Sequence, residues 1–130
     1  MNVSKYANKS TAYLKKKAQE VFNKWIRLRD AEQPCISCGS WNTAHASHYF
    51  SAGKHNHLRF DEDNVWLSCI YCNTFEHGNL INYRHGLIKR IGIERVEVLE
   101  LKAKMKHSTK DDRFLYLDIL NRYSKPPKQN

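Results

Sequence analysis

The apolar positions in the first quarter of the chain recur at steps of three and four residues, which is the spacing of one face of an α-helix. Six of them form a single stripe: Leu14, Ala18, Val21, Phe22, Trp25 and Ile26. Ser10 is a residue type that favours the N-cap, so the pattern predicts a helix from there to about Ala31. The lysines and arginines fall mostly outside the stripe, so the helix can pack by one side and present cations on the other.

The C-terminal part of the chain shows the same spacing three more times. Residues 80–91 predict a second helix, which Gly92 ends, and residues 93–106 predict a third. Ser108 or Thr109 can cap a fourth helix. Its apolar residues are Phe114, Leu115, Leu117, Ile119 and Leu120.

The middle of the chain, residues 35–79, is rich in Cys, His, Asn and aromatic residues instead. Two short β-like pieces lie near residues 44–50 and 64–68, which predicts a small hairpin wrapped by helices. We therefore expect one α+β domain over residues 1–130. It divides into a basic helical arm (1–33), a central core (34–82), and C-terminal helices with a tail (83–130). Five aromatic residues are expected in the core of the central module, and not as base-stacking platforms: Tyr49, Phe50, Phe60, Trp66 and Tyr71.

The charge is strongly unbalanced, with 22 Lys and Arg against 13 Asp and Glu, a net charge of +9. Residues 1–29 carry eight of these cations against Glu20 alone. Such a field favours a polyanion, and nucleic acid is the commonest one; the alternative is a solvated helix face without a partner. With no long apolar run and no signal-like N-terminus, we expect no membrane partner and a cytoplasmic protein, in which cysteines stay reduced.

All four cysteines fall in two CxxC pairs, Cys35 with Cys38 and Cys69 with Cys72. Two residues between cysteines let both thiolates face one ion, and Zn²⁺ takes four thiolates tetrahedrally in closed, structural sites. The pattern predicts one structural zinc per chain, against the alternative of four buried thiols without a metal. A closed site has no open coordination position, so its role is to fix the ends of the segment between the pairs.

Hydrolysis of a phosphodiester needs a base for the attacking water and a divalent cation for the leaving oxygen. The segment between the cysteine pairs holds His45, His48 and Asn64, and the second pair is followed by Asn73 and His77. A neutral histidine serves as a base near pH 7, and oxygen or nitrogen ligands with open positions hold the cation. A β-hairpin followed by a helix can supply both groups.

The order His48, Asn64, then Asn73 or His77 resembles the His-Asn-His motif of ββα-metal nucleases. The resemblance implies that His48 is the general base and that the last position is a ligand of the catalytic ion. It also implies that Asn64 hydrogen-bonds the loop backbone and so orients the histidine.

A longer set of motifs is similar to the NinG (Rap) family of phage recombination proteins. The shared strings are CISCG, the histidine in ASHY, LRF-x-x-x-N, C-x-x-CN and GN-x-x-x-YR-x-x-LI-x-RIG, within about residues 12–100. The family consists of nucleases that act on branched intermediates such as Holliday junctions and D-loops. The resemblance therefore implies a metal-dependent DNA endonuclease with a zinc-bound ββα core, and it implies that role on branched DNA here.

The ligands of the catalytic Mg²⁺ or Mn²⁺ stay open at this point. In the family an Asp often stands where this chain has His45, and a histidine shifts the preference toward softer ions such as Mn²⁺. The strand ligand is thus either His45 or a water-filled position, because Ser47, directly before the base, is a poor ligand. Asn73 is the expected second ligand unless it only caps a helix, and His77 competes with it.

Nine cations are candidate contacts to the DNA backbone: Lys15, Lys16, Lys17, Lys24, Arg27, Lys54, Arg59, Arg84 and Arg90. A junction presents two equivalent strands, so we also expect a homodimer. Three alternatives remain. The chain is a His-Asn-His enzyme that nicks any duplex, a non-catalytic zinc module that binds nucleic acid, or a structural phage protein whose zinc supports a protein interface.

Overall fold

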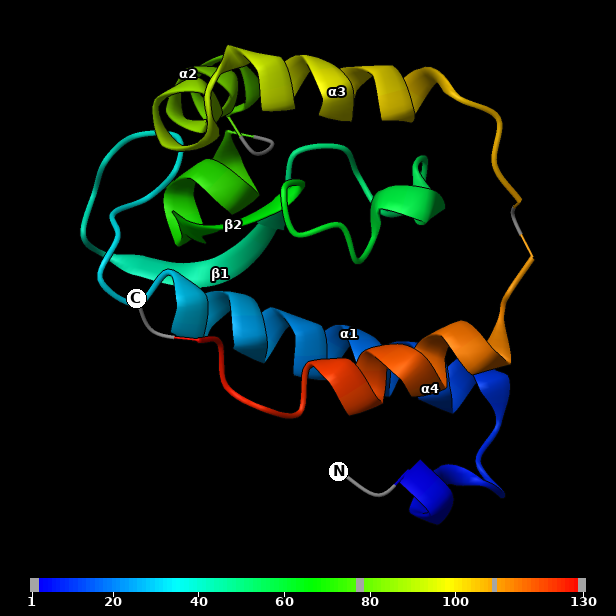
Figure 1. The fold of residues 1–130 in the computed structure, drawn as a ribbon. Helices are drawn as coiled ribbons and strands as arrows, with labels where there is room; N and C mark the ends of the chain where they lie inside the picture. The colour runs from blue at the N-terminus through cyan, green and yellow to red at the C-terminus, as the bar shows by residue number, and fades with distance from the viewer. Residues whose placement is uncertain (1–2, 77–78, 109, 129–130) are drawn as a thin grey trace.

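The computed structural model describes residues 3–76, 79–108 and 110–128. Its order is α1 (Thr11–Arg29), β1 (Thr43–His48), β2 (Val65–Cys69), α2 (Leu80–Ile91), α3 (Ile93–Lys104) and α4 (Arg113–Arg122). Short helical turns lie at Val3–Tyr6, Asn56–Leu58 and Tyr71–Phe75. The β1–β2 hairpin lies between two helical layers, α1 with α4 on one side and α2 with α3 on the other (Figure 1). The predicted α+β class is confirmed.

The helices begin and end close to the expected positions, with one wrong cap. The side chain of Ser10 accepts from the backbone N–H of Tyr13, which confirms it as the cap of α1. The cap of α4 is Asp112, whose carboxylate accepts from two backbone N–H groups of the first turn, and not Ser108; Thr109 lies outside the described residues. A carboxylate both satisfies the unpaired donors of a helix start and favours its positive end. Within the described residues, no helix has the length and apolarity needed to cross a bilayer.

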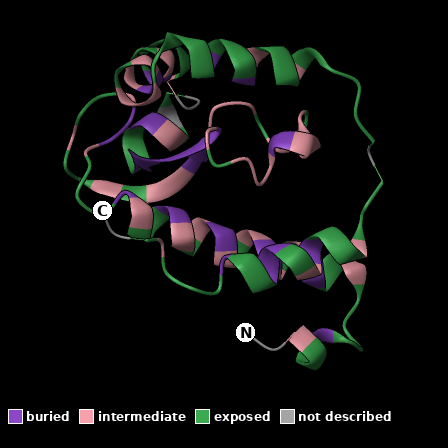
Figure 2. Ribbon diagram, viewed as in Figure 1, coloured by how far each residue is buried: buried purple, intermediate pink, exposed green. Residues whose placement is uncertain are grey.

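Strand β2 is buried along its whole length, because the hairpin is covered on both faces. Side chains alternate between the faces of a strand. Accordingly, Val65 packs into the cluster made by α1 and α4, whereas Trp66 packs into the cluster made by α2 and α3. The antiparallel register pairs Thr43 with Cys69 and His48 with Val65. Figure 2 shows β2 in purple, with buried, purple turns also along α1.

The described part of residues 1–33 belongs to the core. In the apolar stripe of α1, Leu14, Ala18, Phe22 and Ile26 are fully buried, and Val21 and Trp25 are partly buried, in the cluster shared with α4. Trp66 is buried, as expected for a core aromatic, with 8% of its surface exposed. The same expectation is wrong for Tyr71, which is 61% exposed. Strand β2 ends at Cys69, so the alternation that buries Trp66 does not continue to Tyr71.

The outer edge of β2 is closed by residues that sequence reasoning had not selected. The N–H of Leu67 donates to the buried carboxylate of Asp30 (3.0 Å), and its carbonyl accepts from Ile36 N–H (3.1 Å). Arg29 pairs with both oxygens of Asp30, and its guanidinium lies 3.9 Å from the ring centroid of Trp66. These bonds satisfy the backbone N–H and carbonyl of Leu67 at the edge of β2. They also connect the end of α1, and the loop that carries Cys35 and Cys38 (the first cysteine loop), to the hairpin.

Candidate functional site

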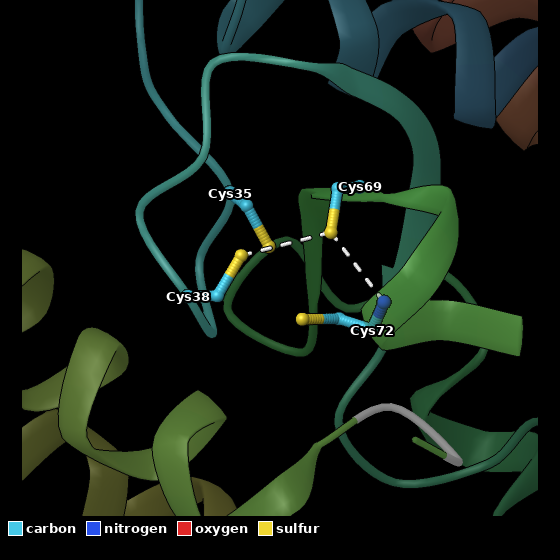
Figure 3. A group of neighbouring side chains, drawn as sticks. All are labelled: Cys35, Cys38, Cys69 and Cys72. Carbon is cyan, nitrogen blue, oxygen red and sulfur yellow. Dashed lines mark hydrogen bonds between the residues drawn. The ribbon is translucent and has the colours of Figure 1, made fainter. Parts of the chain in front are cut away.

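The four cysteines converge on one point (Figure 3). Cys35 and Cys38 come from the loop before β1, Cys69 is the last residue of β2, and Cys72 follows in the next turn. Their sulfur atoms all lie within 4.8 Å of one another, and those of Cys38 and Cys69 are 3.6 Å apart. A tetrahedral ion with metal–sulfur bonds of about 2.3 Å needs sulfurs ~3.8 Å apart. The cluster therefore has the dimensions to hold a metal ion such as Zn²⁺.

The thiols of this cluster differ in how easily they ionise. Burial alone would raise the pKa of Cys35, but backbone N–H groups of Cys69, Cys38 and Ser37 bond its thiolate and lower that pKa to about 7. Burial raises the pKa of Cys72 to about 12. Because a metal binds thiolates, its uptake must displace protons from the less acidic thiols.

Helix α2 packs directly against the first cysteine loop. A Cβ atom at Gly86 would lie 1.9 Å from the carbonyl oxygen of Ile36, between the two cysteines of that loop. The guanidinium of Arg90 donates to the carbonyl of Pro34 (2.6 Å). The second helical layer thus holds the loop at a distance that only glycine permits.

His48, the last residue of β1, is half-buried and held in one orientation. Its Nε2 atom lies 3.0 Å from the carbonyl oxygen of Arg59. A carbonyl can only accept, so Nε2 carries the proton and Nδ1 is the acceptor of the neutral ring. Burial lowers the pKa of His48 below its usual 6.5, with the Arg59 carbonyl opposing that shift. The ring is therefore a neutral base of fixed tautomer at neutral pH.

Asn64 is fully buried and ties together the loop that holds His48. Its Oδ1 accepts from Phe50 N–H (2.8 Å), and its Nδ2 donates to the carbonyls of Phe50 and Leu58 (both 3.0 Å). Leu58 directly precedes Arg59, whose carbonyl contacts His48. The hydrogen bonds between Asn64 and the loop backbone are thus present, and the role in catalysis stays a prediction.

A second polar group lies on the other face of β1. Ser47 Oγ donates to Asn73 Oδ1 (3.0 Å), and Asn73 Nδ2 lies 3.0 Å from His45 Nδ1. Asn73 belongs to the wide turn Tyr71–Phe75, in which Glu76 N–H bonds the carbonyl five residues back. The structure therefore brings two expected ligands together and adds Ser47 to them.

Strand alternation explains which candidates meet. His45 and Ser47 point to one face of β1 and His48 to the other, so His48 is not among the described partners of Asn73. Counting in steps of two from His45 would have selected Ser47 from the sequence. His77 lies outside the described residues.

The nine candidate DNA contacts differ in what already binds them. Four are exposed: Lys16, Lys24, Arg27 and Lys54. Three pair with carboxylates: Lys15 with Asp111, Lys17 with Glu20, and Arg84 with Glu100. Arg59 donates to Asn56 and Gln19, and Arg90 to a backbone carbonyl. Contact with DNA stays a prediction for all nine. The four exposed residues would need the least rearrangement of existing contacts in order to bind DNA.

Comparison with known proteins gives one consistent result. A family model described as the bacteriophage lambda NinG protein matches residues 1–128. The chain is 40% identical to protein ninG of Salmonella phage P22 over 114 residues, which is 86% of this chain and 56% of that protein. It is 43% identical to protein ninG of Escherichia phage 933W and 42% identical to that of Escherichia phage lambda, each over 102 residues and 77% of this chain.

These matches concern only part of the relatives. They cover 51% of the phage 933W protein and 50% of the lambda protein, so the chain spans about half the length of the curated relatives it matches. No solved structure matches the chain. Since the family model covers nearly the whole chain, the resemblance found in its motifs is confirmed, and the chain belongs to the NinG family of bacteriophage proteins.

Proposed function

We propose that this chain is a metal-dependent DNA endonuclease that hydrolyses phosphodiester bonds in branched recombination intermediates. The observation that carries the proposal is the hydrogen bond from His48 Nε2 to the Arg59 carbonyl. It fixes the neutral tautomer in which Nδ1 accepts, which is what a general base for water requires. The role of His-Asn-His nucleases on Holliday junctions and D-loops, implied by the family resemblance, supplies the substrate class.

His48 and the candidate ion ligands lie on opposite faces of β1. In a metal-assisted hydrolysis the base and the ion act on the same phosphate, whose attacking and leaving oxygens lie on opposite sides of the phosphorus atom. Ser47 is buried and the strand backbone lies between the two groups, so a phosphate would have to meet both of them at an end of β1 and not across the strand.

His45 and Asn73 are the ligands of a divalent ion with open positions in this proposal. They offer a ring nitrogen and an amide oxygen, and Asn73 is hydrogen-bonded to both His45 and Ser47 (3.0 Å each). These donors are neutral, so they suit Mn²⁺ better than Mg²⁺, which usually has carboxylate ligands; the phosphate would add anionic oxygens. A bound ion would stabilise the charge that develops on the leaving oxygen.

The four-cysteine cluster has a different role in this proposal. Four thiolates close the coordination shell of Zn²⁺, so the ion is structural and holds the two ends of the hairpin segment. The exposed cations of α1 and Lys54 bind the DNA backbone without reading base sequence. A homodimer would present two such sites to the two equivalent strands of a junction.

One cleavage experiment tests the proposal. A four-way junction and a linear duplex of the same sequence are incubated with the zinc-loaded protein and Mn²⁺ or Mg²⁺. We expect cleavage of the junction, and a loss of about 100-fold or more in His48→Ala, with junction binding and zinc content retained. His107→Ala, which removes an exposed histidine between α3 and α4, is the matched control and should cleave normally.

The other outcomes favour the alternatives. No cleavage by the wild-type protein with either ion would support a non-catalytic zinc module. Equal cleavage of junction and linear duplex would support an enzyme that nicks any duplex. Sedimentation that shows only monomer, with and without junction DNA, would contradict the homodimer.

A further inference from the structure

Three large side chains are exposed at the zinc-cluster end of the hairpin. They are Trp41, 71% exposed, Ile70, 50% exposed, and Tyr71, 61% exposed. We call these three residues the knuckle-end patch. Trp41 lies just before β1, and the other two lie between the cysteines of the second pair. Because the register pairs Thr43 with Cys69, the segments just before β1 and just after β2 emerge at the same end of the sheet.

The patch is attached to a rigid base. Ile70 and Tyr71 lie between Cys69 and Cys72, and Trp41 lies three residues after Cys38, so the cysteine cluster fixes the backbone on both sides. The other tryptophan of the hairpin, Trp66, is buried. A backbone that is already fixed loses no further freedom when a flat partner stacks on the rings it carries, which favours binding.

The surroundings of the patch hold two cations and one carboxylate, that of Glu76, which accepts from the Tyr71 hydroxyl (2.9 Å). A cleft of about 390 Å³ lies between the first cysteine loop and α2 and adjoins the segment that leads to Trp41. Lys89 and Arg90 line it, and so do Cys35 and Cys38, whose thiolates are anionic when the cluster holds a metal ion. One nitrogen of Arg90, Nη1, is buried without a hydrogen-bond partner among the described residues. Two cations beside exposed rings match a nucleic acid, which offers phosphates and flat bases together.

The patch also adjoins the proposed catalytic centre. Tyr71 and Asn73 lie in the same helical turn, Tyr71–Phe75, with only Cys72 between them. A base that stacks on the patch would therefore lie next to the strand held at Asn73. In a linear duplex both faces of every internal base are already covered by its neighbours. At a branch point bases can unstack at lower cost and expose a face.

We infer that the knuckle-end patch is a stacking platform for unstacked bases at the branch point of DNA, and that it supplies a preference for branched over linear DNA. This inference rests on the proposed function, because it names the feature of the substrate that the same site recognises. The partner is the base face, which any of the four bases offers, so the platform adds structure preference without a base code.

The test measures binding and base stacking without cleavage. The zinc-loaded protein is mixed, in Ca²⁺ and without Mg²⁺ or Mn²⁺, with a four-way junction that carries 2-aminopurine at the branch point. A second junction carries the probe within an arm, and a linear duplex serves as the unbranched substrate. Affinity is measured by anisotropy, and stacking by quenching of the 2-aminopurine fluorescence.

We expect quenching by the wild-type protein at the branch point only. Trp41→Ala and Tyr71→Ala should each weaken junction binding by about tenfold and remove the quenching, with duplex affinity changed less than about twofold. Trp41→Phe, which keeps a stacking face, should retain most of both signals. Phe114→Ala removes a 79% exposed ring on α4 and is the matched control, which should behave as wild type.

Two results would overturn the inference. Wild-type affinity of Trp41→Ala for the junction would leave a protein as the occupant of the patch. An equal loss on junction and duplex, with zinc content and melting temperature unchanged, would show a contact that does not depend on branching. Either result leaves the proposed function standing, because cleavage tests that proposal separately: it fails if the wild-type protein does not cleave DNA, or cleaves junction and linear duplex equally.

Discussion

The Nε2 atom of His48 lies 3.0 Å from the carbonyl oxygen of Arg59, eleven residues further along the chain. That carbonyl is itself positioned, because the preceding carbonyl, of Leu58, accepts from the buried amide of Asn64 (3.0 Å). The buried side chain of Asn64 therefore fixes the conformation of this loop. The loop in turn fixes the tautomer and orientation of the His48 imidazole. Among the described hydrogen bonds, none joins the side chains of Asn64 and His48 directly, and backbone carbonyl groups of the loop connect them.

Asn64→Ala should both destabilise the fold and disorder the imidazole of His48. The change removes three hydrogen bonds in a fully buried position and leaves the backbone groups of residue 50 and the carbonyl of Leu58 unsatisfied. We expect a loss of about 2–4 kcal/mol in the free energy of unfolding, measured with denaturant. Asn8→Ala, at an exposed asparagine, should cost almost nothing. An Asn64→Ala protein of wild-type stability would show that the loop does not depend on this amide.

The pKa of His48 should lie below 6.5, because burial disfavours the imidazolium. Below pH 6.5 the unfolded chain then binds a proton that the folded chain does not, so this residue makes stability fall as the pH falls toward the folded pKa. Above pH 6.5 its contribution is constant. NMR titration of the ring gives the pKa, and the difference between wild-type and His48→Gln stability from pH 5 to 7.5 gives the linkage. A ring pKa at or above 6.5 would contradict the burial seen here.

Sequence periodicity predicted the elements whose stability is local. The stripe of α1 and its cap at Ser10 depend on neighbours within one or two turns. The end of α2 requires a positive φ (86°) at Gly92, and glycine itself marks such a position in the sequence. The cap of α4 was missed because Ser, Thr and Asp are all good caps. Which one is used depends on where α4 meets α1.

The contacts that define the candidate site are long-range, and periodicity does not report them. Asp30 bonds Leu67, 37 residues away, and Ser47 bonds Asn73, 26 residues away. The cysteine spacing did predict that the two ends of the segment between the CxxC pairs meet, because one metal site needs all four thiolates. The exposure of Tyr71 was not predicted, because nothing in the sequence marks the residue at which β2 leaves the core.

Cys69→Ser should remove the metal and most of the folded structure around the hairpin. Structural zinc in small modules contributes on the order of 10 kcal/mol to folding, more than the stability of a typical small domain. We expect one zinc per wild-type chain by elemental analysis, and none, with collapsed amide dispersion, in the variant. Ser51→Ala, at an exposed loop serine, is the control. A wild-type chain that stays folded after the metal is stripped would show that the cluster is dispensable.

Gly86→Ala should destabilise the protein although alanine is the better helix former by about 1 kcal/mol. The new Cβ would lie 1.9 Å from the carbonyl oxygen of Ile36, so α2 or the first cysteine loop must move. Overpacking of this kind costs about 1–3 kcal/mol, and the displaced loop carries Cys35 and Cys38, so zinc should also be lost faster to a chelator. Gly53→Ala, where a Cβ meets nothing within 4 Å, should be neutral or slightly stabilising. Denaturant unfolding and the rate of zinc release measure both effects. A Gly86→Ala protein as stable as Gly53→Ala would mean that α2 does not hold the cysteine loop in solution.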